Sequence, residues 1–191
     1  MCLIIFSYQP NSSTPLVVAA NRDEFFARPT AQADIWTDKS TEERVLAGRD
    51  LQAGGTWLGV TQSMRFAAVT NIRDPSQAEQ RPLSRGELTR GFLQGQESAE
   101  QYSYSLADSF DQDAGYNLLL SDGDSFFYIN NQQKEISSVE AGVHGLSNGL
   151  LDSPWPKIAK GKSALQALID SDENIRTDHL IAMMNDREQA E

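Results

Sequence analysis

The first 24 residues constrain the fold of this chain most strongly. Two short apolar runs, at residues 3–6 and 16–20, flank a polar segment at 9–13 that is rich in turn-forming residues. This pattern predicts a β-hairpin. Antiparallel pairing returns residues 21–24 to the end of the first strand, where Cys2 lies. The sequence therefore predicts that Asn-Arg-Asp-Glu and Cys2 share one sheet edge.

Cys2 is the only cysteine in the chain. Cellular removal of an initiator methionine favours a small second residue, so we expect Cys2 to become the N-terminus. A free α-amine has a reference pKa of about 8 and a thiol of about 8.5, so both can react near neutral pH. Such a residue can be nucleophile and base at once, and a cation such as Arg22 favours the thiolate. The alternative is a small apolar residue that begins a buried strand, the usual role of a free cysteine.

Composition narrows the class of protein and its partners. The 191 residues are 39% apolar and 23% charged, as in a globular protein with one substantial core. The net charge of −11 argues against nucleic acid and anionic membranes as partners. No apolar run approaches the roughly 20 residues of a membrane span, and no signal-peptide pattern precedes the first strand. A single thiol suits a reducing compartment, so we expect a cytoplasmic protein.

Further strands are predicted after the first hairpin. Residues 25–43 are polar and predict a surface loop anchored by Trp36. Alternating and continuous apolar runs then predict two more hairpins and one short strand: 56–61 with 65–72, 116–120 with 126–129, and 143–147.

Four helices are predicted between and after these strands. Capping-box patterns begin at Ser84 and at Ser98. Ser153-Pro154 predicts a third helix with proline at its first position, weakened by about 1 kcal/mol at Gly161. A fourth is expected at about residues 178–187. Hairpins that alternate with helices define an α+β fold.

Asn-Arg-Asp-Glu behind Met-Cys and an apolar strand resembles the NRDE family, which includes the transport and Golgi organisation 2 proteins. The match extends over most of the chain through six further blocks: Ala47-Gly48-Arg49-Asp50, Gly54-Gly55-Thr56-Trp57-Leu58-Gly59, Val69-Thr70-Asn71-Ile72-Arg73, Ser84-Arg85-Gly86-Glu87-Leu88, Gly145-Leu146-Ser147-Asn148-Gly149 and Pro154-Trp155-Pro156-Lys157.

This resemblance implies a fold. The family resembles the cysteine branch of the N-terminal-nucleophile hydrolases, with bile-salt hydrolase and penicillin V acylase. The implied fold is a single domain over 1–191, a four-layer αββα sandwich with two stacked antiparallel sheets between helical layers. Family members usually continue into further strands with a Gly-Thr-Arg pattern. We therefore expect either a naturally short protein or a sandwich that is incomplete at the C-terminus.

The resemblance also implies catalytic residues. Cys2 matches the nucleophile, Arg22 the arginine beside it, and Asp23 the carboxylate that orients the α-amine. Asn71 and Asn148 match polar groups around the reacting carbonyl, with Asn148 as the preferred oxyanion donor. Such a donor contributes about 3–4 kcal/mol to transition-state stabilisation. Without the resemblance, Arg22 and Asp23 are interpreted as a charged turn that closes the hairpin, and Asn71 and Asn148 as residues that cap the ends of strands.

Other chemistries find little support in the sequence. His144 and His179 lack metal-ligand spacing, residues 53–55 lack the lysine and context of a phosphate loop, and there is no Gly-x-Ser-x-Gly elbow. We expect no cofactor and no metal. Four aromatic residues are expected in the core or, less often, in a pocket wall: Phe25, Phe26, Trp57 and Trp155.

Three functions remain open from the sequence. The first is a cysteine N-terminal-nucleophile amidohydrolase that acts on a non-peptide amide or acyl compound. The second is a non-catalytic trafficking protein that binds haem or acyl-CoA-like ligands in the same cleft. The third is a structural relic in which an Arg22–Asp23 ion pair holds the hairpin.

Overall fold

The computed structural model describes residues 2–37, 41–72, 84–112, 114–171 and 174–185. The chain forms two compact units: unit 1 comprises Met1–Asp23 and Glu140–Glu191, and unit 2 comprises Glu24–Val139. Each unit has an antiparallel sheet with helices packed against it, which confirms the α+β class. The four-layer stacking of the sheets and the single-domain organisation stay predictions.

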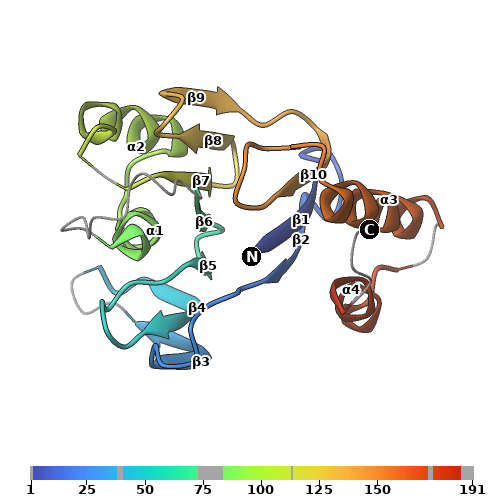
Figure 1. Ribbon diagram of the computed structural model, residues 1–191, viewed down its shortest axis with the longest axis horizontal. Coiled ribbons are helices and arrows are strands. Elements are labelled where there is room, and N and C mark those ends of the chain that lie inside the picture. The colour runs from blue at the N-terminus through green and yellow to red at the C-terminus, as the bar shows by residue number, and fades with distance from the viewer. Residues whose placement is uncertain (1, 38–40, 73–83, 113, 172–173, 186–191) are drawn as a thin grey trace. The chain divides into compact units, whose positions relative to one another are not determined.

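The sheet of unit 1 is built on the predicted N-terminal hairpin. β1 (Leu3–Tyr8) pairs antiparallel with β2 (Leu16–Asn21), and β10 (Gly142–Leu146) pairs antiparallel with the other edge of β1 (Figure 1). β1 is therefore the central strand of three. Its residues 4–6 are fully buried, as expected for the apolar run at the middle of a sheet.

Two helices complete unit 1. α3 (Pro156–Asp170) packs on β1 and β10, and α4 (Thr177–Met184) packs on β2 and α3. The predicted start of α3 at Pro154 is wrong by two residues, because residues 150–155 are held in turns by backbone hydrogen bonds from Ser153 to Leu150 and from Trp155 to Ser153. The proline at the first helical position is Pro156. The last residues of the predicted fourth helix, 186 and 187, lie outside the described ranges.

Two glycines let α3 lie directly on the sheet. A Cβ atom on Gly161 would lie 2.7 Å from Cδ1 of Ile5, and one on Gly145 would lie 2.6 Å from Cγ2 of Ile158. Both distances are far inside van der Waals contact. The helix-weakening Gly161 is thus explained by close packing between α3 and β1.

Unit 2 contains a seven-stranded antiparallel meander in which each strand pairs with the next along the chain. The predicted hairpins at 56–61 with 65–72 and at 116–120 with 126–129 are confirmed. The strands are β3 (Thr30–Thr37), β4 (Arg44–Asp50), β5 (Leu58–Thr61), β6 (Phe66–Asn71), β7 (Tyr116–Ser121), β8 (Phe126–Asn130) and β9 (Glu135–Ser138).

The prediction of a loop over residues 25–43 is wrong, because β3 lies within it. β3 is an edge strand, and all of its residues except Trp36 are exposed. Ala31, Ala33 and Ile35 alternate with the polar residues Gln32 and Asp34, a period-two pattern typical of a strand, so the sequence did carry a signal for β3. Trp36 is an anchor, as expected: its Nε1–H donates to the carbonyl oxygen of Ala47 at 3.4 Å, and its ring packs against the core.

Two α-helices and a short 3₁₀ turn connect β6 to β7. They are α1 (Arg85–Gln94), α2 (Ala99–Ser105) and η1 (Ala107–Ser109). The capping box at α2 is confirmed, with both hydrogen bonds between Ser98 and Gln101 formed at 3.1 Å. At α1 the capping box is wrong: Ser84 makes no side-chain cap, because the Glu87 N–H donates to the Ser84 carbonyl oxygen at 2.8 Å, and the Glu87 carboxylate accepts from Arg90.

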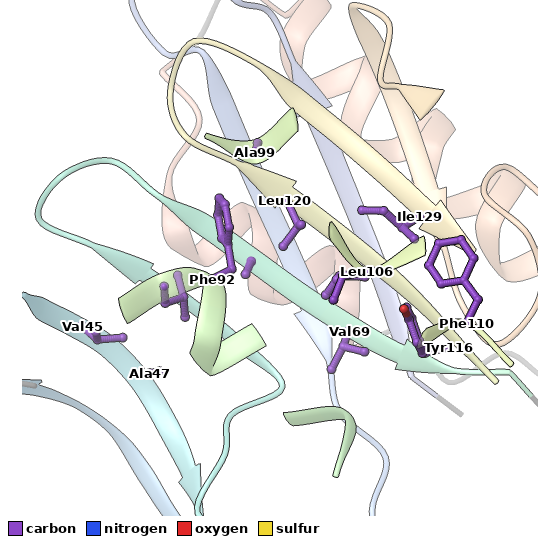
Figure 2. Packing of buried hydrophobic residues seen from close by; sticks show 13 residues of the cluster. Val45, Ala47, Val69, Phe92, Ala99, Leu106, Phe110, Tyr116, Leu120 and Ile129 are labelled. Carbon is purple, nitrogen blue, oxygen red and sulfur yellow. The ribbon is translucent and has the colours of Figure 1, made fainter. Parts of the chain in front are cut away.

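The core of unit 2 lies between its sheet and these helices (Figure 2). Phe92 and Leu93 of α1 are fully buried against the sheet. Thirteen buried residues form this cluster: Val45, Ala47, Ala67, Val69, Phe92, Leu93, Ala99, Leu106, Phe110, Tyr116, Leu118, Leu120 and Ile129.

Candidate functional site

Cys2 lies immediately before the central strand of unit 1 and is 8% exposed. Leu3 faces Asn21 on β2, and Ile4 faces Leu146 on β10. Continuing the β2 register by one residue puts Cys2 opposite Arg22, and continuing the β10 register by two residues puts it opposite Asn148. The prediction that the hairpin returns residues 21–24 to the end of the sheet where Cys2 lies is confirmed.

Asp23 contacts Cys2 through its main chain. The thiol sulfur of Cys2 lies 3.9 Å from the carbonyl oxygen of Asp23, within the range of a weak S–H hydrogen bond. Asp23 is exposed and Arg22 is half-buried. Their predicted roles, orienting the α-amine and favouring the thiolate, stay predictions.

Ser147 is a site residue that the sequence analysis missed. Its buried hydroxyl donates to the carbonyl oxygen of Cys2, with 2.6 Å between the oxygens. The sequence predicts Ser147 only as the end of a strand. Its place beside Asn148 in the Gly-Leu-Ser-Asn-Gly block was the available signal.

Lys157 was missed as well. Its ammonium nitrogen lies 3.4 Å from the same Cys2 carbonyl oxygen and 5.6 Å from the centre of the Trp155 ring. Lys157 is the second residue of α3 and is half-buried. Its presence in the Pro-Trp-Pro-Lys block was the only sequence signal, because a lysine on a helix is ordinarily a solvated surface residue.

Asn148 follows Ser147 and is 5% exposed. The turn that carries it is fixed to β10 by Asp152, whose backbone N–H donates to the Gly145 carbonyl at 2.8 Å while its carboxylate accepts from the Gly145 N–H at 2.9 Å. His144 and Lys162 each contact the same carboxylate at 2.7 Å. The structure therefore brings Asn148 to the end of the sheet where Cys2 lies, on a restrained turn.

Asp152 carries a strongly shifted pKa. Burial raises its pKa, but hydrogen bonds from His144, Lys162 and the Gly145 N–H outweigh burial and hold the value at about 2. The carboxylate is therefore ionised at neutral pH, when it can accept all of these bonds.

Asn71 belongs to the other unit. It is exposed and ends β6, opposite Tyr116 on β7. Its predicted role near the reacting carbonyl stays a prediction.

The aromatic residues divide between the core and the surface. Trp57 is half-buried against the core of unit 2, and Trp155 is half-buried as the residue before α3. Phe25 and Phe26 are 83% and 110% exposed, so their assignment to the core is wrong. They lie in a turn after β2 rather than in a strand, where alternation would bury one side chain in two.

Several of the sequence blocks stabilise unit 2. A Cβ on Gly55 would lie 2.5 Å from the carbonyl carbon of Gly86, and the Thr56 N–H donates to the Gly86 oxygen. Arg28 donates to the Asp50 carboxylate at 2.6 Å. Burial raises the pKa of Asp50, but this bond and backbone donors lower it on balance. The blocks at 47–50, 54–59 and 84–88 thus have structural contacts that account for them.

Metal chemistry gains no support from the described ranges, where no group of three or more His, Cys, Asp or Glu side chains is arranged to hold an ion. Among the helices in this part of the chain, none has the length and apolar character that crossing a bilayer requires.

Fold and site together define an α+β protein of antiparallel sheets, with its only cysteine at the end of the central strand of the smaller sheet, beside a buried Ser-Asn pair. The model of the family "Transport and Golgi organisation 2" matches residues 1–191, and the chain belongs to that family, as the sequence resemblance predicted.

Relatives and one solved structure were compared with the chain. The Transport and Golgi organization 2 homologues of Mus musculus and Homo sapiens are each 33% identical over 199 residues, which covers 97% of this chain and 71% of theirs. The Drosophila melanogaster protein is 27% identical over 88% of this chain and 65% of its own. Penicillin V acylase from Agrobacterium tumefaciens is similar over 86% of this chain and 49% of its own, with 14% identity and a TM-score of 0.38.

Proposed function

We propose that this protein is a cysteine N-terminal-nucleophile amidohydrolase that acts on a non-peptide amide or a related acyl compound. The observation that carries the proposal is the register of β10, β1 and β2. It leaves Cys2 at the end of the central strand, between the ends of its two neighbours. A reactive group held on a rigid sheet is better preorganised than one on a loop.

The proposed reaction begins with removal of Met1, which gives Cys2 a free α-amine. That amine takes the thiol proton, and the thiolate attacks the substrate carbonyl to form a tetrahedral oxyanion. The C–N bond then breaks, the leaving amine takes a proton from the Cys2 ammonium, and a thioester remains. Water hydrolyses the thioester, releasing the carboxylic acid and restoring the thiol.

The other residues act on this cycle through charge and hydrogen bonding. Asn148 donates to the oxyanion, and its burial strengthens that interaction. Arg22 favours the thiolate, and Asp23 orients the α-amine. Asn71 supplies a second polar group or positions the substrate.

Acyl turnover of p-nitrophenyl acetate, an activated reporter substrate, tests the proposal. We expect wild-type protein to release p-nitrophenolate in a burst followed by a steady state, and Cys2→Ala to abolish both. Ser7→Ala is the matched control, because it removes one heteroatom from a buried position on the same strand. Equal release by wild type and Cys2→Ala would overturn the proposal.

A further inference from the structure

Two side chains from opposite ends of a turn meet at one backbone atom. Ser147, after β10, and Lys157, on α3, both donate to the carbonyl oxygen of Cys2, at 2.6 and 3.4 Å. A carbonyl oxygen has two lone pairs and can accept both bonds. Ser147 and Lys157 therefore both hold the main chain of Cys2, although they lie 145 and 155 positions further along the sequence.

The position of Lys157 is set by the packing of its helix. Gly161 lies one turn further along α3 and allows the helix to approach Ile5 of β1 closely. The Lys157 ammonium also lies over the Trp155 ring, 5.6 Å from its centre. A half-buried ammonium that contacts both an aromatic ring and a carbonyl oxygen is restrained more than a solvated lysine would be.

Helix stability does not account for a lysine at this point. The N-terminal turn of a helix carries partial positive charge, so a cation there is unfavourable. α3 has no acidic residue in its first turn that would offset Lys157. The unfavourable placement agrees with a role at Cys2 rather than within the helix.

We infer that Lys157 is a positioning residue for Cys2, which fixes the Cys2 main chain together with Ser147 and holds a positive charge beside the reactive amine and thiol. This inference rests on the proposed function. A nearby positive charge favours the thiolate over the thiol and the neutral amine over the ammonium. Both effects assist a residue that must be nucleophile and base.

Other charged groups act on the same edge of unit 1. Arg22 and Asp23 follow β2, and the carbonyl oxygen of Asp23 lies 3.9 Å from the sulfur of Cys2. Lys160 and Lys162 also lie on α3, and Lys162 pairs with Asp152. Lys157, in contrast to the Lys162 ion pair, contacts Cys2 itself.

The pH dependence of iodoacetamide labelling at Cys2 tests this inference. Wild type is compared with two variants. Lys157→Met keeps a long unbranched side chain but removes the positive charge, and Lys157→Arg keeps the positive charge. Lys134→Met is the matched control, since it removes one lysine charge from an exposed ion pair with Asp111 in unit 2. Thermal unfolding of each variant reports separately on the fold.

We expect Lys157→Met to raise the midpoint of the pH–rate profile by about 0.5–1 pH unit, as one partly screened charge would. The rate at pH 7 then falls about 3- to 10-fold. Lys157→Arg should recover the rate to within about twofold, and Lys134→Met should match wild type. A purely structural Lys157 would lower the unfolding temperature without moving the midpoint.

The outcomes separate the inference from the proposed function. If Cys2 is activated but its pH–rate profile is the same in Lys157→Met and wild type, the role of Lys157 is overturned and the proposed hydrolase function is unaffected. A wild-type Cys2 that labels no faster than free cysteine at every pH overturns both. A raised midpoint in Lys157→Met, recovered by Lys157→Arg, supports the inference.

Discussion

The hydroxyl of Ser147 donates a hydrogen bond to the carbonyl oxygen of Cys2 across 145 positions of sequence, with 2.6 Å between the two oxygens. Both residues are buried. This bond joins the start of β1 to the end of β10 and adjoins Asn148, the proposed oxyanion donor. It makes the geometry of the candidate site part of the stability of unit 1.

Ser147→Ala should therefore destabilise the protein. Removing the buried donor costs about 1–2 kcal/mol, and the unfolding temperature should fall by about 2–8 °C for a chain of this size. Ser171→Ala is the control, because Ser171 donates to the Leu168 carbonyl in an exposed position. We expect the control to cost less than about 0.5 kcal/mol. Equal losses, measured by urea unfolding, would contradict the importance of the Cys2 bond.

The Asp152 carboxylate should make the stability of unit 1 depend on acid pH. Its pKa is lowered from 3.8 to about 2 in the folded protein. Its contribution is therefore complete above about pH 4 and is lost as pH falls towards 2. Because the side chain is 32% exposed, we expect about 1–2 kcal/mol after discounting for solvent screening.

Asp152→Asn tests this dependence. The free energy of unfolding should be lower than that of wild type at pH 7, and the difference should shrink between pH 4 and pH 3. Asp111→Asn, which breaks an exposed ion pair, should show little difference at any pH. A difference for Asp152→Asn that stays constant down to pH 3 would contradict the shifted pKa.

Gly161→Ala should destabilise the protein although alanine is the better helix former. The added methyl would lie 2.7 Å from Ile5 Cδ1, and overpacking of about 1–3 kcal/mol outweighs a helix gain of about 1 kcal/mol. Ile5→Val, which removes that carbon, should recover part of the loss in the double variant. Ser163→Ala, at an exposed position of the same helix, should be neutral or slightly stabilising. A stabilised Gly161→Ala would contradict the packing of α3 on β1.

These packing relationships mark the limit of what the sequence could predict. The hairpin of β1 and β2 was predictable because two apolar runs flank a turn, and pairing alone then returns Arg22 to Cys2. The family resemblance predicted that Asn148 lies near Cys2, and the register of β10 with β1 agrees with that prediction. Lys157 was not predictable, since its contact with Cys2 depends on how closely α3 approaches the sheet. β3 was predictable, because Ala31, Ala33 and Ile35 alternate with polar residues, but the overall polarity of residues 25–43 favoured a loop instead.

Ligand titration separates the catalyst from the carrier. If the protein is a hydrolase, haem followed by absorbance and acyl-CoA followed by calorimetry should show no saturable binding to wild type. A carrier predicts the reverse: tight, saturable binding that survives Cys2→Ala, together with slow labelling of the thiol. Haem binding that disappears in Cys2→Ala would instead identify the thiol as a haem ligand. Either form of saturable binding, without acyl turnover, would contradict the proposed function.

The intact mass of the protein purified from the organism that encodes it tests the central claim most directly. The proposed base is the α-amine of Cys2, which exists only after Met1 is removed. We predict a mass lower by one methionine residue, with Cys2 as the first residue of the N-terminal peptide. Quantitative retention of Met1 would contradict the proposal, because the α-amine would then belong to the wrong residue.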